Sequence, residues 1–157
     1  MTRSSSSPSP WKSRRLIAVI GAFTTTALLF SLVLFPNYLP NLNEFILLAP
    51  IATAVTTWLV WGFLVERNEH HGIVRGILVG GLIGIAAHYV CWYLFAWYAF
   101  LSTLITEPTK LGTVINPLNA LWLASGPFLL GMTMVGWITT PIAMALGAVC
   151  GRSWVKH

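Results

Sequence analysis

Long runs of apolar residues alternate with short polar segments along this chain. Four runs cover residues 16–35, 45–65, 77–104 and 118–150, and all thirteen formally charged residues lie outside them. Each run reaches the roughly 20 residues that a helix needs to cross about 30 Å of hydrocarbon. The alternation of apolar and polar residues that a membrane β-barrel requires is absent. The pattern therefore predicts an all-α integral membrane protein, a bundle of four transmembrane helices.

Proline and glycine residues indicate where the predicted spans end. Pro36 is expected to stop the first span, and Gly151 to end the last. The last run is too long for one straight span, and a Ser-Gly-Pro sequence at residues 125–127 interrupts it. We therefore predict a short interfacial or re-entrant helix at residues 117–124. The four spans are expected at about residues 16–35, 45–65, 75–104 and 126–150.

Lys and Arg are unevenly distributed between the two sides of the predicted bundle. Eight of the nine fall before the first span, between the second and third spans, or after the fourth, and Lys110 falls on the other side. Positive residues in short loops stay on the cytoplasmic side during insertion. Both termini are therefore expected to face the cytoplasm. The membrane is a plasma or inner membrane, or an organellar membrane such as the thylakoid.

The segments before and after the bundle are short. The first fifteen residues are rich in Ser and Pro and cannot bury apolar surface, so residues 1–15 are predicted to form a disordered cytoplasmic tail. Residues 152–157 form a second, short cytoplasmic tail. The chain is thus expected to contain one folded domain, the transmembrane bundle of residues 16–151.

Composition narrows the classes of partner. The chain is 56% hydrophobic and 8% charged, whereas soluble domains are about 25% charged. The formal net charge of +5 is explained by the orientation signal and by attraction to anionic lipid head groups. Composition therefore indicates the lipid bilayer as a partner and indicates no nucleic acid.

Small residues recur at every fourth position in two of the predicted spans. In the third span they are Gly72, Gly76, Gly80 and Gly84. In the fourth span they are Ala143, Gly147 and Gly151. Such spacing places small residues on one helix face, where another backbone can approach closely. Either a helix of the same chain fills this groove, or the groove binds a second copy or another membrane-protein subunit.

His88 is the histidine that lies well inside a predicted span, one turn after Gly84 and one turn before Trp92. The run 87–92, with His70 eighteen residues before His88, resembles the pigment-ligating helix of bacterial light-harvesting antenna polypeptides. The resemblance covers one helix of the four, and it implies a tetrapyrrole ligated by His88 beside the empty space at Gly84. The alternative is a structural His88, hydrogen-bonded to a Ser, Thr or Tyr of a neighbouring helix.

The densest polar cluster is the loop at residues 66–71. Glu66 and His70 lie one helical turn apart and are a candidate pair of ligands for a divalent ion. The favoured interpretation is a solvated cytoplasmic loop, so no metal site is predicted. Catalysis requires convergent acid, base or nucleophilic groups, and only this loop offers any. We therefore expect no enzyme activity.

Three functions remain compatible with these observations. The first is a non-catalytic subunit or assembly factor of a larger membrane complex, or a homo-oligomer, docking through the glycine-rich helix. The second is a transporter or channel for a small uncharged solute, with threonines lining a neutral path. The third is a membrane protein that binds a tetrapyrrole or a quinone at a site centred on His88, Gly84 and Trp92.

Overall fold

The computed structural model describes residues 10–38, 44–66, 72–109, 116, 118–119 and 125–153. Four of the helices within these ranges are long and apolar enough to cross a membrane. They extend over Arg14–Leu34, Phe45–Val65, Ile73–Thr106 and Gly126–Arg152. The prediction of a helical chain with four helices able to span a membrane is therefore confirmed for the described residues.

The four spans are built from seven consecutive helical segments. The first span lies in α1 (Pro10–Tyr38), and the second is α2 (Phe45–Trp61), which continues into the π-helical turn η2 (Gly62–Glu66). The third lies in α3 (Ile73–Thr106). The fourth combines α5 (Ser125–Gly131), the π-helical turn η4 (Met132–Gly136) and α6 (Trp137–Ser153).

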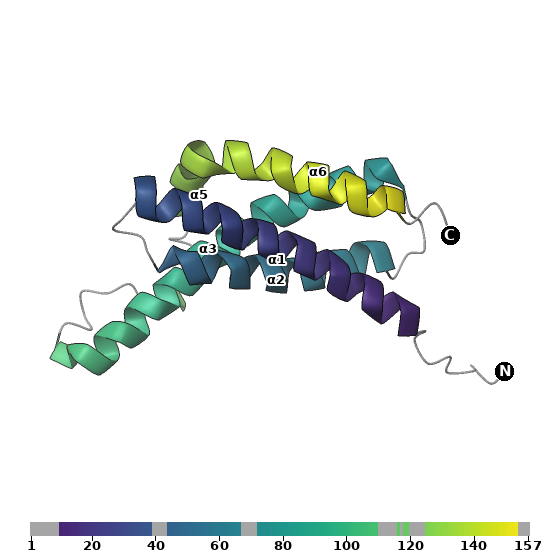
Figure 1. The fold of residues 1–157 in the computed structure, drawn as a ribbon. Coiled ribbons are helices and arrows are strands. Elements are labelled where there is room, and N and C mark those ends of the chain that lie inside the picture. Colours follow the sequence, from purple (N-terminus) through teal and green to yellow (C-terminus); the bar gives the residue numbers. More distant parts are fainter. Residues whose placement is uncertain are drawn as a thin grey trace, which may run out of the picture.

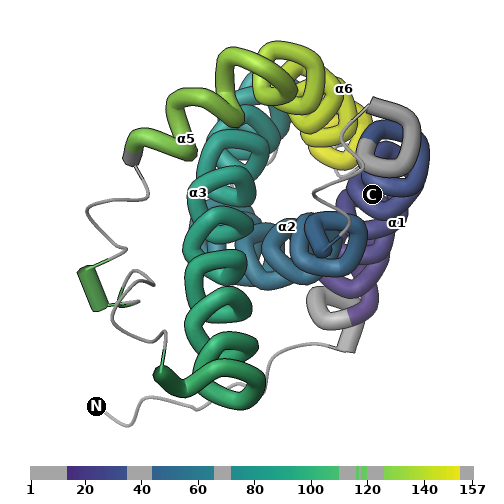
Figure 2. The backbone as a smooth tube through the Cα atoms, turned by 90° about the vertical axis from the view of Figure 1, so that its left-hand side faces the viewer, coloured from purple at the N-terminus to yellow at the C-terminus, as the bar shows by residue number. Residues whose placement is uncertain are grey.

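The spans run alternately in opposite directions, so that the start of α1 and the end of α6 lie at the same end of the bundle (Figure 1). Viewed along the bundle, α1, α2, α3 and α6 form a ring (Figure 2). The main contacts join α3 to α6, α1 to α2, and α2 to α3, whereas α1 and α6 touch less. At the end of the bundle where α3 begins, the guanidinium of Arg75 donates a hydrogen bond to the carbonyl of Leu64 in η2.

Helix ends differ from the sequence-based expectations at α1. The helix begins at Pro10, within the predicted tail, because proline is well tolerated in a first turn, where its missing N–H is not needed. It also passes through Pro36 and ends at Tyr38, since a proline so near the end costs a single backbone hydrogen bond. Residues 1–9 and 154–157 of the predicted tails lie outside the described residues.

The predicted short helix before the fourth span also falls largely outside the described residues. Of residues 117–124, the structure describes Leu118 and Asn119. The amide of Leu118 donates to the side-chain oxygen of Asn116 at 3.0 Å, and the amide of Asn119 donates to the Asn116 carbonyl at 2.8 Å. These two bonds are typical of a helical start at Asn116.

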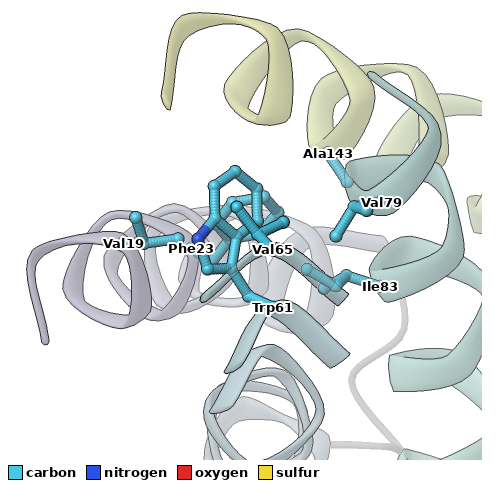
Figure 3. Packing of buried hydrophobic residues seen from close by; sticks show 7 residues of the cluster. All are labelled: Val19, Phe23, Trp61, Val65, Val79, Ile83 and Ala143. Carbon is cyan, nitrogen blue, oxygen red and sulfur yellow. The ribbon is translucent and has the colours of Figure 1, made fainter. Parts of the chain in front are cut away.

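Two clusters of buried side chains hold the ring together. The first joins α1, α2, η2, α3 and α6 and contains Val19, Phe23, Trp61, Val65, Val79, Ile83 and Ala143 (Figure 3). The second joins α2 to α3 around Phe45, which packs on Trp92 and Phe95 with ring centroids 4.9 and 4.8 Å apart. In lipid, such close packing rather than the hydrophobic effect favours helix association.

The last turns of α3 leave the bundle. The helix has 34 residues, which correspond to about 51 Å at 1.5 Å per residue, well beyond the hydrocarbon thickness. Figure 1 shows its carboxyl-terminal part leaving the other helices toward the lower left. Leu101, Leu104 and Ile105 are exposed there. The part of α3 that packs against the other spans is therefore its first two thirds.

Candidate functional site

The glycine stripes of α3 and α6 pack directly on each other. A Cβ atom added at Gly76 would overlap the carbonyl oxygen of Gly147, and one added at Gly80 would overlap that of Ala143. Conversely, a Cβ at Gly147 would overlap the Gly76 carbonyl. The two backbones are therefore in contact, and we call this contact between residues 72–84 and 140–151 the glycine seam.

The seam extends over all seven small residues that the sequence singled out. At one end, a Cβ on Gly151 would lie 2.7 Å from the carbonyl oxygen of Gly72. At the other end, a Cβ on Gly84 would lie 3.2 Å from both the Cβ of Ala143 and the Cα of Thr140. The glycine face of α3 is thus covered by α6 of the same chain. In this arrangement the face is closed to a second protein.

Beyond the seam, side chains rather than backbones connect α3 to the last span. Tyr89 meets Phe128 with ring centroids 5.8 Å apart, and Trp92 lies against Gly131. Between the helices lies a cavity of about 470 Å³, with walls from all four spans. Its volume is within the roughly 300–1,000 Å³ typical of small-molecule sites. The sequence did not predict this cavity.

The cavity wall is apolar apart from a few side chains, and no Asp, Glu, Lys or Arg of the described ranges lines it. Three of the polar side chains are threonines whose hydroxyls donate to carbonyls of their own helices. Thr26 donates to Ala22 at 2.9 Å, Thr53 to Ala49 at 2.8 Å, and Thr139 to Val135 at 3.3 Å. These hydroxyl protons are therefore committed to the backbone and not offered to the cavity.

His88 lines the cavity from α3, and its Nδ1 lies 3.1 Å from the carbonyl oxygen of Gly84. A carbonyl can only accept, so Nδ1 carries the proton, and a neutral ring then has a lone pair on Nε2. The sequence suggested a Ser, Thr or Tyr of a neighbouring helix as partner, and in the structure Nδ1 instead lies next to a carbonyl of its own helix, one turn earlier.

Ser31 of α1 also lines the cavity, and α1 and α3 lie on different sides of the ring of helices (Figure 2). The Ser31 side chain is 2% exposed. Sequence reasoning missed Ser31, because one serine in an apolar run carries no pattern.

Trp92 and Gly84 were also predicted to hold a cofactor with His88, and the structure agrees with this only in part. Trp92 does line the cavity, between Phe45 and α5. Gly84 also borders it, but the empty space expected beside Gly84 is filled by Thr140 and Ala143. A flat macrocycle therefore cannot lie against α3 there, and the residues present do not fit a tetrapyrrole.

Neither the polar loop nor comparison with known proteins indicates a function for this chain. Residues 67–71 of the polar loop lie outside the described residues. Within the described ranges, no three His, Cys, Asp or Glu residues lie together as metal ligands would. Comparison with known proteins finds no matching family model, curated protein or solved structure. The functional argument therefore rests on the cavity.

Proposed function

We propose that this chain is a non-catalytic multi-pass membrane protein that binds an apolar ligand in the cavity between its four spans. The observation that carries the proposal is a cavity of about 470 Å³ whose walls are apolar and come from every span. An apolar cavity of about 150 Å³ already stays dry and binds benzene. A cavity of this size accommodates a considerably larger apolar molecule.

The same lining argues against the two competing functions. A path for a polar solute needs donors and acceptors along its walls, whereas Thr26, Thr53 and Thr139 bond to their own helices. An enzyme needs several convergent reactive groups. The cavity offers one imidazole and no carboxylate.

We also propose assembly into a homo-oligomer or a larger membrane complex, but through a surface other than the glycine face of α3. Because α6 covers the glycine face of α3, a partner would bind to another face of the bundle. Crosslinking in the native membrane, followed by electrophoresis, distinguishes a monomer from an assembly. An assembly that is lost when Gly80 is replaced, while the monomer stays folded, would restore the glycine face as the docking surface.

We further propose that both termini face the cytoplasm. The start of α1 and the end of α6 share one end of the bundle, and Arg14, Arg15, Arg75 and Arg152 belong to that end (Figure 1). Positive residues stay on the cytoplasmic side. A reporter fused after His157 is expected to stay in the cytoplasm, and one inserted near Thr109 to be exported. The reverse labelling would contradict this orientation.

Ligand binding is tested by native mass spectrometry of the protein in mild detergent, with 1-bromooctadecane as the probe because its bromine isotopes mark the bound mass. We expect wild type to bind it and Ala27→Phe to lose it, since Ala27 lines the cavity from α1. Leu28→Phe is the matched control on the exposed side of α1. Equal binding by both variants would overturn the proposed function.

A further inference from the structure

We infer that the cavity holds one hydrocarbon chain of a bilayer lipid, which enters sideways between α1 and the part of the last span formed by α5 and η4. This inference rests on the proposed function and specifies the chemical class of the ligand and its route. It follows from where the cavity is open, where it is closed, and how far it extends into the membrane.

The cavity is open along one side, which the exposed residues of its lining mark. Pro127, Leu130 and Met134 line the cavity and are exposed, Leu130 by 62% and Met134 by 61%. All three belong to α5 and η4, and their spacing of three and four residues places them on one helix face. The other lining residues are buried or half-buried. The mouth of the cavity therefore runs along this face.

The packing of the helices shows on which side of α5 and η4 the mouth lies. In the ring, the last span has α3 on one side and α1 on the other (Figure 2). The segments α5 and η4 pack on α3, whereas α1 packs chiefly on α2. Figure 2 also shows α5 well away from α1. The mouth therefore lies on the α1 side, where Phe30 and Leu34 form the facing part of the wall.

The mouth reaches into the hydrocarbon of the membrane and does not open only at its surface. The fourth span begins at Gly126, and Met134 lies about 12 Å of helix rise farther along it. What lies outside the mouth at this depth is lipid, because the surrounding span is apolar and long enough to cross the membrane. A ligand that enters here therefore comes from the bilayer.

The first buried cluster closes the deep end of the cavity. Phe23, Ile83 and Ala143 belong both to that cluster and to the cavity lining. On α1 the lining extends from Leu34, the last residue of the span, to Phe23, about 16 Å of helix rise. One leaflet provides half of a hydrocarbon core about 30 Å thick, so this length matches a single lipid chain. The methyl end of the chain then lies against the cluster, and the head group stays at the membrane surface.

The chemistry of the wall suits a chain without polar groups. No Asp, Glu, Lys or Arg of the described ranges lines the cavity. The hydroxyls of Thr26, Thr53 and Thr139 donate to carbonyls of their own helices, and Nδ1 of His88 donates to the Gly84 carbonyl. A hydrocarbon chain needs no polar partner, whereas a buried head group would, so the head group remains outside.

The test uses two photoreactive phosphatidylcholines in liposomes that contain the full chain. One carries a diazirine at the methyl end of an acyl chain, and the other carries it near the carbonyl carbon of the same chain. After illumination, peptide mass spectrometry locates the labelled residues. We expect the methyl-end probe to label Phe23 and Ile83, which are buried and which a lipid outside the bundle does not reach. The carbonyl-end probe should instead label Pro127, at the start of the span.

A matched pair of variants tests the mouth itself. Leu130→Trp narrows the mouth, because Leu130 lines it. Leu129→Trp is the control, since Leu129 is the neighbouring residue, is equally exposed at 62%, and is not part of the lining. We expect Leu130→Trp to lose most of the labelling at Ile83 and Leu129→Trp to retain it. Equal labelling of the two variants would contradict the proposed route.

The wild-type protein alone can overturn the inference, so the test does not depend on a variant that folds. If the methyl-end probe labels only lipid-facing residues such as Leu29 and Leu32, and leaves Phe23 and Ile83 unlabelled, no lipid chain enters the cavity. Binding of 1-bromooctadecane would then leave the proposed function in place and remove only this inference. Failure of that probe to bind as well would overturn both.

The parent lipid of the chain is determined by a separate arm. Accurate mass of the molecule that stays bound in native mass spectrometry, after purification from the native membrane, distinguishes a phospholipid from another long-chain lipid. Recovery of a molecule without a long hydrocarbon chain would contradict the inference.

Discussion

The contact between α3 and the last span changes character along its length. At Gly76 and Gly80 the two backbones touch, with no side chain between them. From His88 to Trp92 the same span is reached through aromatic side chains, and a cavity lies beside them. The difference shows that small residues determine where this bundle is closed, and large residues where it is hollow.

Both regions follow from packing in lipid. Helices in a bilayer gain little from the hydrophobic effect, so association depends on how closely their surfaces fit. The seam provides that fit, whereas the stack of Phe45, Trp92 and Phe95 takes up space between α2 and α3. We therefore expect the seam and the first buried cluster to contribute most of the stability, and the hollow region to be available for binding.

The largest effect is expected from Gly147→Leu. A Cβ there would overlap the Gly76 carbonyl, so α3 and α6 must move apart. Overpacking by added carbons costs about 1–3 kcal/mol and occasionally more. Because two rigid backbones are in contact here, we expect Gly147→Leu to lower the free energy of unfolding by about 3 kcal/mol or more. The free energy of unfolding in lipid discs, measured by steric trapping, checks it.

Gly21→Leu is the control for that change, since nothing lies within 4 Å of a Cβ added at Gly21. It is expected to leave the free energy of unfolding unchanged within about 0.5 kcal/mol, as surface substitutions usually do. If both variants unfold equally easily, the seam does not hold the bundle.

Replacing one valine in each region by phenylalanine is expected to change the free energy of unfolding by an intermediate amount. The sign of the change is opposite in the two regions. Val79 is buried in the first cluster, so Val79→Phe should lower the free energy of unfolding by about 1–3 kcal/mol. Val135 lines the cavity, so Val135→Phe fills space and should raise it by about 0.5–2 kcal/mol. The same unfolding assay without ligand checks both. A loss at Val135 as large as at Val79 would mean that the hollow region is in fact packed.

The smallest effect is expected from His88→Ala. The imidazole bonds within its own helix, to the Gly84 carbonyl, and ties no two spans together. The free energy of unfolding of the ligand-free protein should fall by less than about 0.6 kcal/mol, the mean for hydrogen bonds between spans. A loss above about 2 kcal/mol would show that His88 holds helices together.

Much of the fold was predictable because it depends on sequence features that recur at regular intervals. Runs of apolar residues predicted four spans, and the four-residue spacing of glycines indicated the face of α3 on which the stripe of Ala143, Gly147 and Gly151 lies. The start of α1 at Pro10 was missed, because a proline that ends a helix and one that begins it look alike in sequence. The turns η2 and η4 carry no sequence signal that we recognise.

The candidate site was predictable only in part. His88 and Trp92 were singled out from the sequence, and both line the cavity. The cavity itself depends on the distances between four helices, which no single run of residues encodes. Ser31 was identified only because it lines the same cavity as His88, a relation between residues far apart in the chain.

The order of the helices along the chain affects how the site is assembled on the ribosome. Synthesis proceeds from the amino terminus, so α1, α2 and α3 exist before α6 does. Until α6 docks through its glycines, His88 and Ser31 border a trough that is open to the bilayer along its whole length. Docking of α6 is then also the step that completes the cavity, because Ile142, Ala143 and Leu146 of α6 supply part of its wall.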